Sequence, residues 1–161
     1  MPALEKITLA PGLTFDTLVA GEPGAPLVLL LHGFAESMHC WRAQVTALAA
    51  AGYRAVAPSQ RGYSPGARPD TRDTANYHID RLMDDAMALS AASGYGEHRF
   101  HLVGHDWGGS IACPSGWHRS PYCHGRIRTP SIGRCKFPMA IRRTARGITR
   151  PFSNPVRPIC C

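Results

Sequence analysis

The sequence predicts an α/β fold, built on a mostly parallel sheet, in one domain over residues 1–112. Short apolar runs alternate there with longer stretches of helical periodicity, and this alternation is typical of parallel strands joined by right-handed crossover helices. The run APLVLLLHG at 25–33 is continuously apolar, as expected for a strand buried on both faces. The stretch 76–94 instead repeats its apolar residues at helical intervals, which indicates an amphipathic helix.

Local patterns place the other strands of this domain. KITLA at 6–10 and LTFDTLVAG at 13–21 are expected to form an antiparallel pair, since the second alternates apolar and polar residues. YRAVAP at 53–58 and HRFHLVGHD at 98–106 predict two further strands. Between them, SQRGYSPGARPD at 59–70 is rich in Gly and Pro, so a connecting loop is expected there rather than a basic binding loop.

Two helices are expected from the spacing of apolar residues. The first covers 37–53 and ends at Gly52, and its buried face would be formed by Trp41, Val45, Leu48 and Ala49. The second lies within 76–94, and its buried face would be formed by Ile79, Leu82, Met83, Ala86 and Leu89. Each helix would therefore pack against one face of the sheet.

A glycine-flanked aspartate follows the last predicted strand. Gly104, Asp106 and Gly108 fit the pattern of a nucleophile elbow, in which glycines permit a sharp strand-to-helix turn that exposes the central side chain. His32 and Gly33 end another buried strand, beside which the elbow would lie. Simpler alternatives are a helix N-cap for Asp106 and a plain strand end for His32 and Gly33. His105 and His101 are expected to be packing and structural histidines.

The first 112 residues resemble the N-terminal half of an α/β-hydrolase of the epoxide hydrolase and haloalkane dehalogenase group. The resemblance is carried by HGFAES at 32–37, AGYRAVAPSQRGYSPGARP at 51–69 and HLVGHDWGG at 101–109. The pair Asp106–Trp107 separates this group from the serine hydrolases. Two positions depart from the usual pattern, because Ala35 stands where the group has Pro and Ser59 where it often has Asp.

The resemblance implies a role for five residues. Asp106 would be the nucleophile that attacks an epoxide or alkyl halide and forms an ester with the enzyme. The backbone N–H groups of Phe34 and Trp107 would form the oxyanion hole, on a loop that begins with His32 and Gly33. The expected substrate is a small apolar electrophile, and the expected chemistry needs no cofactor and no metal.

The rest of the family's catalytic machinery is not recognisable after the elbow. No Asp or Glu follows Asp106, so the triad acid has no candidate. His118 and His124 follow too closely to be the late base, and Tyr122 is too early for a lid tyrosine. Pro114 is expected to shorten the elbow helix, and the last strands would be missing, which would leave a sheet edge unpaired.

Residues 113–161 differ from the first part in composition. They hold ten Lys and Arg, no acid, and five of the six cysteines, whereas residues 1–112 hold eight basic and eleven acidic residues. We interpret this segment as a truncated or frameshifted end of the hydrolase and expect a mostly irregular, disordered tail. The alternatives are a catalytically inactive fragment whose basic tail binds non-specifically and an interaction protein that uses the tail.

Two kinds of site are disfavoured in this tail. A zinc site would need Cys113, His118, Cys123, His124 and Cys135, which lack the paired C-x2-C spacing. Nucleic acid could be held through its phosphates alone, so no specific nucleic-acid partner is expected.

The sequence contains no recognisable targeting or membrane segment. MPALEKITLA at 1–10 lacks a basic, then apolar, leader pattern, and the longest apolar run, LVLLL at 27–31, is too short to cross a bilayer. We therefore expect a cytoplasmic protein without a membrane partner, in which the cysteines are reduced thiols.

Overall fold

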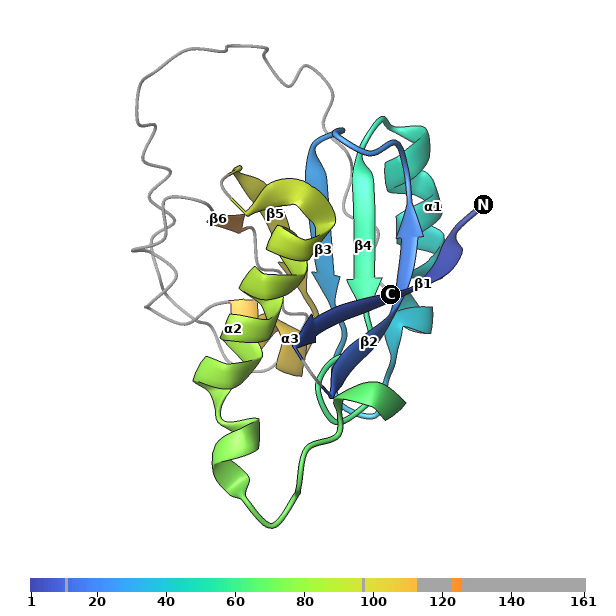
Figure 1. Cartoon of the computed structure of the whole chain (residues 1–161). Helices are drawn as coiled ribbons and strands as arrows, with labels where there is room; N and C mark the ends of the chain where they lie inside the picture. The colour runs from blue at the N-terminus through green and yellow to red at the C-terminus, as the bar shows by residue number, and fades with distance from the viewer. Residues whose placement is uncertain (11, 97, 113–122, 126–161) are drawn as a thin grey trace, which may run out of the picture. The chain divides into compact units, whose positions relative to one another are not determined.

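The computed structural model describes residues 1–10, 12–96, 98–112 and 123–125. The chain divides into two compact units, Met1–Thr129 and Pro130–Cys161. The second unit lies wholly outside the described residues, so the proposed change of structure at 112/113 and the disorder of the tail stay predictions. Figure 1 shows the described elements with their labels.

Six strands in the described part of the chain form one mixed sheet, in the order β1-β2-β4-β3-β5-β6. Their bounds are β1 Ala3–Ala10, β2 Leu13–Ala20, β3 Leu27–Leu31, β4 Arg54–Pro58, β5 Phe100–Gly104 and β6 Cys123–Gly125. The predicted antiparallel start is confirmed, because β1 pairs with β2 in antiparallel register, with Ile7 opposite Phe15. Strand β2 then pairs antiparallel with β4, whereas β4, β3 and β5 are parallel to one another.

The helical elements lie between these strands. They are the 3-10 turns η1 Met38–Trp41, η2 Pro65–Ala67 and η3 Thr74–Tyr77, the helices α1 Arg42–Ala50, α2 Ile79–Ser90 and α3 Trp107–Ala112, and the π-helical turn η4 Ala91–Tyr95. The helix expected over 37–53 therefore begins with a 3-10 turn, a common form of helix N-termini. It ends as predicted before Gly52, which has a φ of 86°.

Apolar side chains cover both faces of the sheet. On one face, Leu27, Leu29 and Leu31 of β3 pack with Leu82 and Ala86 of α2 and with Ile111 of α3. On the other face, Val28 and Leu30 pack with Val45 of α1. All five residues of β3 are buried, as the sequence predicted, because successive side chains of a strand point to opposite faces. Figure 1 shows α1 and α2 on the two sides of the sheet.

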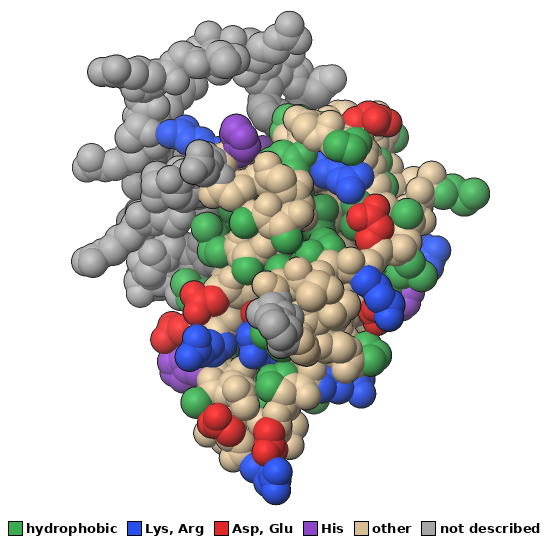
Figure 2. All heavy atoms as spheres, in the orientation of Figure 1, with side chains coloured by type: hydrophobic (Ala, Val, Ile, Leu, Met, Phe, Trp, Pro, Cys, Tyr) green, Lys and Arg blue, Asp and Glu red, His purple; other side chains and the backbone are tan. Residues whose placement is uncertain are grey.

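The surface of the described part carries charges of both signs. On the face shown in Figure 2, Lys and Arg side chains lie interspersed with Asp and Glu. In the described ranges no helix has the length and apolarity that a bilayer crossing requires.

One expectation about packing was wrong, and another was incomplete. The sheet edge beside β5 is paired, because β6 runs parallel to it with Phe100 opposite Cys123; the tail after residue 112 thus contributes a short strand. The inner face of α2 also includes Asp85, which is buried beside the predicted apolar residues. An aspartate is tolerated there because a guanidinium pairs with it, as described below.

Candidate active site

The turn between β5 and α3 presents Asp106 to solvent. Asp106 has a φ of 50°, a left-handed backbone conformation that is unusual for a residue with a side chain. The flanking glycines are required by space: a Cβ atom on Gly108 would overlap the carbonyl oxygen of Leu31 and lie 2.6 Å from that of His32. A Cβ on Gly104 would overlap the backbone of Gly108. The glycine–aspartate–glycine spacing read from the sequence therefore has a direct steric cause.

The carboxylate of Asp106 is held by backbone N–H groups from two segments. The N–H of Phe34 donates to Oδ2 at 2.9 Å, and the N–H of Trp107 also hydrogen-bonds to the carboxylate. The carbonyl of Asp106 accepts the first hydrogen bond of α3, from the N–H of Ser110 at 3.1 Å. The side chain thus reaches across to the loop after β3 instead of only capping its own helix.

These contacts favour the ionised form of Asp106. The hydrogen bond from the Phe34 N–H lowers the pKa of this carboxyl most, the Trp107 N–H lowers it further, and partial desolvation opposes both. Because the group is exposed, its carboxylate is accessible to molecules from solution. An ionised, accessible carboxylate is the form in which aspartate acts as a nucleophile.

The loop after β3 carries the first of these donors. Gly33 lies against the side chain of Asp106, since a Cβ on Gly33 would lie 2.8 Å from the Cβ of Asp106. Ala35 has a φ of 60°, so the loop bends sharply just after Phe34. Glu36 closes the loop, because its Oε2 accepts the N–H of Gly33 at 3.1 Å.

Glu36 also contacts His105, the residue before Asp106. Its Oε2 lies 3.2 Å from Nδ1 of His105. Burial alone would raise the pKa of Glu36, but the hydrogen bonds from Gly33 and His105 together lower it. His105, expected to be a packing residue, is a partly exposed polar partner of Glu36 instead, because the elbow turns its ring toward the loop after β3.

His32 is buried between the loop after β3 and the segment after β4. Its Nδ1 lies 2.8 Å from the carbonyl oxygen of Gly33, and its Nε2 lies 3.0 Å from the backbone N of Gln60. The side-chain amide of Gln60 donates to the carbonyl of His32 at 2.6 Å. The ring of Tyr63 meets the imidazole edge-on, with the centroids 4.7 Å apart. Burial lowers the pKa of His32 and keeps the ring neutral.

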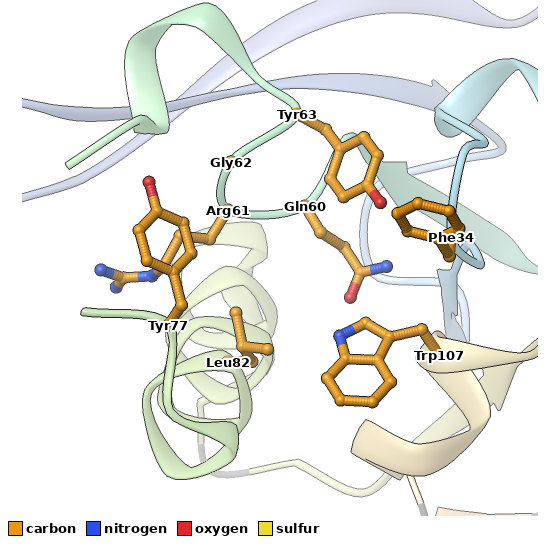
Figure 3. A pocket seen from close by; sticks show the side chains of 8 residues that line it. All are labelled: Phe34, Gln60, Arg61, Gly62, Tyr63, Tyr77, Leu82 and Trp107. Carbon is orange, nitrogen blue, oxygen red and sulfur yellow. The ribbon is translucent and has the colours of Figure 1, made fainter. Parts of the chain in front are cut away.

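An open pocket of about 460 Å³ lies beside the elbow. It is lined by Phe34, Gln60, Arg61, Gly62, Tyr63, Tyr77, Leu82 and Trp107. Figure 3 shows the rings of Phe34, Tyr63, Tyr77 and Trp107 around it. Phe34 is 78% exposed and Trp107 49% exposed. These two residues, whose backbone N–H groups contact Asp106, thus present apolar surface at the mouth of this pocket. Such a lining favours an apolar ligand.

Two polar arrangements hold the pocket wall. The guanidinium of Arg61 donates to both carboxylate oxygens of Asp85, at 2.7 and 2.6 Å, and their side chains are only 9% and 10% exposed. The hydrogen bonds to Asp85 raise the pKa of Arg61, whereas its burial opposes them. Arg61 therefore fixes the segment after β4 to α2.

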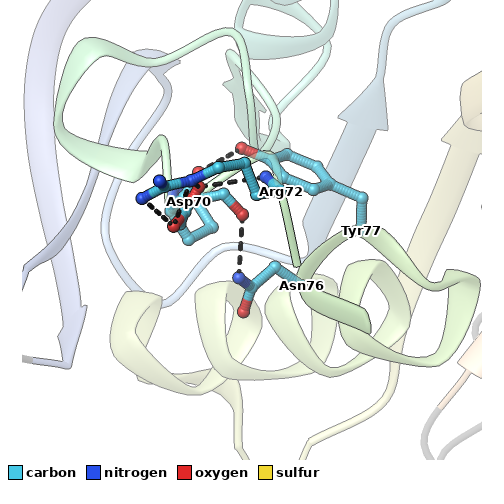
Figure 4. Close-up of polar contacts among 5 residues, drawn as sticks. Asp70, Arg72, Asn76 and Tyr77 are labelled. Atoms are coloured by element: carbon cyan, nitrogen blue, oxygen red, sulfur yellow. Dashed lines mark hydrogen bonds and ion pairs between the residues drawn. The ribbon is translucent and has the colours of Figure 1, made fainter. Parts of the chain in front are cut away.

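The second arrangement holds Tyr77. Its hydroxyl donates to the carbonyl of Pro69 at 2.8 Å, and the side chain of Asn76 donates to the carbonyl of Asp70 at 3.1 Å. Arg72 forms a fork with the carboxylate of Asp70, because its Nε donates to Oδ1 at 3.0 Å and its Nη2 to Oδ2 at 2.8 Å. Figure 4 shows this group of contacts, which anchors the Tyr77 ring at the pocket.

A comparison with known protein families matches this chain to one of them. A family model described as alpha/beta hydrolase fold matches residues 26–113, more than half of the chain. The chain belongs to the alpha/beta hydrolase fold family. The matched residues include β3, β4 and β5, the loop of Phe34 and the turn of Asp106.

Several relatives of this alpha/beta hydrolase carry the name epoxide hydrolase. Epoxide hydrolase A of Mycobacterium tuberculosis is 43% identical over 107 residues, 66% of this chain and 32% of that protein. Human epoxide hydrolase 4 is 44% identical over 101 residues, 63% of this chain and 26% of that protein. The chain thus spans about a third of the length of the curated relatives it matches, or less.

A solved structure agrees with the sequence comparison. The crystal structure of epoxide hydrolase A from Mycobacterium thermoresistibile superposes with a TM-score of 0.61 at 38% identity, over 69% of this chain and 33% of that one. The resemblance read from the motifs is therefore confirmed at the level of an epoxide hydrolase-like member of the alpha/beta hydrolase family.

The described structure of this alpha/beta hydrolase brings all five predicted site residues together. Gly33, Phe34 and Trp107 contact Asp106 directly, and His32 lies behind them. His101 stands edge-on to Tyr53 and Trp41 packs against the core, which agrees with the structural roles expected for both. Among the tail residues considered, Cys113, Pro114, His118, Tyr122 and Cys135 lie outside the described residues; for Cys123 and His124 only the backbone is described.

Sequence reasoning missed the residues that make the pocket wall. Gln60, Arg61 and Tyr63 were assigned only to a connecting loop, and Glu36 was given no role. A signal was present, because ligand sites of parallel α/β sheets lie beyond the carboxyl ends of the strands. Gln60 comes two residues after β4 ends at Pro58, and the loop of Phe34 follows β3 directly.

Proposed function

We propose that this alpha/beta hydrolase uses Asp106 as a nucleophile toward epoxides and related small electrophiles. The observation that carries the proposal is the engagement of one carboxylate oxygen, Oδ2, by the Phe34 N–H at 2.9 Å, at the mouth of an apolar pocket. Oδ2 is thereby occupied, and the second oxygen, Oδ1, is the proposed attacking atom. The names of the epoxide hydrolase relatives support epoxides as the first class of substrate to test.

The first step forms an ester. Oδ1 of Asp106 bonds to an epoxide carbon, and the bond between that carbon and the epoxide oxygen breaks. The released alkoxide takes a proton from water, so the product is a 2-hydroxyalkyl ester of Asp106 with no group lost. With an alkyl halide, the carbon–halogen bond breaks instead and a halide ion leaves.

The second step would need water to attack the ester carbonyl. Negative charge would then develop on Oδ2, which already faces the N–H of Phe34, with the N–H of Trp107 beside it. Donors placed in advance for such a charge are worth about 10²–10³ in rate for each one. We therefore propose that these two N–H groups form the oxyanion hole for ester hydrolysis.

Hydrolysis also needs a base to activate the water. The sequence has no Asp or Glu after Asp106, and its only later histidines are His118 and His124. We propose that the 161-residue chain by itself completes the first step and retains the ester. Its expected behaviour is therefore the uptake of one equivalent of epoxide without continued release of diol.

Intact-protein mass spectrometry tests this proposal. The purified chain is incubated with styrene oxide, and one added epoxide mass is expected, mapped to the peptide that contains Asp106. Asp106→Asn should abolish the adduct. Asp80→Asn, which removes a carboxylate that is 75% exposed on α2, should leave it unchanged and is the matched control.

Three outcomes would contradict the proposal. No adduct on the folded wild-type chain, or an adduct spread equally over exposed carboxylates, would refute the nucleophile assignment. Release of many equivalents of diol that stops in Asp106→Asn would keep the nucleophile and refute the retained ester. Parallel incubation with an alkyl bromide, followed by bromide release, compares the two substrate classes.

A further inference from the structure

We propose that His32 is a positioning residue: its neutral Nδ1–H tautomer holds the Gly33–Phe34 peptide so that the Phe34 N–H points at Asp106. His32 does not itself line the pocket, and the resemblance assigned it only to the loop that carries the oxyanion hole. The catalytic meaning of this contact rests on the proposed function, whereas the contact itself is tested separately below.

The hydrogen bonds of His32 leave it a single tautomer. The backbone N of Gln60, 3.0 Å from Nε2, can only donate, so Nε2 must be the acceptor and carry no proton. The proton of the neutral ring is then on Nδ1, which donates to the carbonyl oxygen of Gly33 at 2.8 Å. The main chain of Gln60 therefore determines which nitrogen of His32 is the donor.

The Gly33 carbonyl and the Phe34 N–H belong to one peptide group. A trans peptide is planar, and its C=O and N–H point in opposite directions; the described residues contain no cis peptide. Fixing the oxygen of Gly33 toward His32 therefore directs the N–H of Phe34 the other way, to Oδ2 of Asp106 at 2.9 Å. A rotation of this peptide group that broke the hydrogen bond from His32 to the Gly33 carbonyl would also turn the Phe34 N–H away from Asp106.

The surroundings hold His32 in place. Its side chain is 0% exposed, the Gln60 side chain donates to its carbonyl at 2.6 Å, and Tyr63 packs edge-on against its ring. Glu36 is the charged group that acts on His32, and its backbone N makes a longer contact of 3.4 Å to the Gly33 carbonyl. The His32 Nδ1–H is thus the shorter of the two hydrogen bonds to that oxygen.

The backbone of the loop is strained directly after Phe34. Ala35 follows Phe34 in a left-handed conformation, with a φ of 60°, and its strain must be held by contacts from elsewhere. The hydrogen bond from His32 is such a contact. Doubly protonated His32 would present Nε2–H to the Gln60 N–H, donor to donor, and the arrangement would be lost.

Two variants test the roles of the two ring nitrogens of His32 separately. In His32→Asn, the side-chain NH₂ takes the place of Nδ1–H and can still donate to Gly33. In His32→Gln, the longer side chain reaches the position of Nε2 and can accept from Gln60, but it leaves the Gly33 carbonyl without its donor. The proposal therefore expects His32→Asn to rescue what His32→Gln loses.

Nuclear magnetic resonance of the full chain, without substrate, measures the effect. In the wild type, the ¹⁵N spectrum of the His32 ring is expected to show the Nδ1–H tautomer. The Phe34 amide proton should lie at low field because it donates to a carboxylate. In His32→Gln that proton should move upfield and the pKa of Asp106 should rise toward its ordinary value, while in His32→Asn both should stay near wild type.

Each result decides the proposal. An Nε2–H tautomer in the wild type, which needs no variant to fold, would overturn it, as would an unmoved Phe34 amide in folded His32→Gln. If the His32 tautomer or the Phe34 amide shift differs from the expected result while styrene oxide still alkylates Asp106, the positioning role is wrong and the proposed function stands. If the signals appear as expected without alkylation, the positioning role is supported and the nucleophile assignment is wrong.

Discussion

The backbone N–H of Phe34 donates to Oδ2 of Asp106 across 2.9 Å, although the two residues are 72 positions apart in the chain. Phe34 follows β3 and Asp106 follows β5, and these strands are parallel neighbours, with Leu31 opposite Gly104. Because the carboxyl ends of both strands lie at one edge of the sheet, the donor and the carboxylate meet there. The same edge receives Gln60 after β4, so three loops build the site.

The first prediction concerns Gly108, where an alanine should destabilise the protein. Alanine is favoured over glycine within a helix by about 1 kcal/mol, but its Cβ here would overlap the carbonyl oxygen of Leu31. We expect Gly108→Ala to lower the free energy of unfolding by about 1–3 kcal/mol, as overpacking does. Urea unfolding followed by circular dichroism measures this change.

Gly24→Ala is its control, since a Cβ there meets nothing within 4 Å. Its φ of 85° still makes alanine unfavourable, by about 1 kcal/mol. A Gly108→Ala protein as stable as wild type would show that the elbow is not as tightly packed as described.

The second prediction concerns the titration of Asp106. The N–H groups of Phe34 and Trp107 lower its pKa, so its ¹³C carboxyl resonance should titrate with a midpoint below the ordinary value of 3.8. A lowered pKa in the folded state stabilises the fold above the unfolded pKa, and this contribution is lost as the pH falls through the folded pKa. Phe34→Pro removes one donor and should raise the midpoint; Phe34→Leu keeps the N–H and should not.

The third prediction concerns the ion pair of Arg61 and Asp85. Both side chains are about nine-tenths buried and joined by two short hydrogen bonds. Removing one partner leaves a buried charge alone, so Asp85→Ala should cost about 3–5 kcal/mol of unfolding free energy. The double variant Arg61→Met with Asp85→Leu should recover most of this loss, and equal losses in the single and double variants would argue against the pairing.

The fourth prediction is a pH dependence of stability due to His32. Burial lowers its pKa below 6.5 in the folded protein, so between the folded pKa and about 6.5 the unfolded chain binds more protons than the folded chain. Stability should therefore rise with pH from the folded pKa of His32 up to about 6.5. His32→Asn cannot titrate, so its unfolding free energy, measured in urea over this range, should depend less on pH than that of the wild type.

Much of the fold could be predicted from local patterns. The continuous apolar run became β3, the period-two run became β2, and the helical spacing of Leu82, Ala86 and Leu89 became the buried face of α2. These predictions succeeded because side-chain direction repeats every two residues in a strand and every 3.6 in a helix. The elbow could also be predicted, because close contacts exclude a Cβ atom at Gly104 and Gly108. The pattern of Gly104, Asp106 and Gly108 is therefore visible within a short stretch of sequence.

Tertiary structure alone decided the contacts around Asp106. Nothing within the sequence near His32 shows that the N–H of Gln60 selects its tautomer, or that Glu36 reaches His105 rather than solvent. Likewise, the sequence shows Asp85 only as a polar residue on an apolar helical face. The structure shows that Arg61, from the segment after β4, pairs with it. Periodicity reports which face of an element is buried, but the partner on that face depends on the order and direction of strands, which bring distant loops to one edge of the sheet.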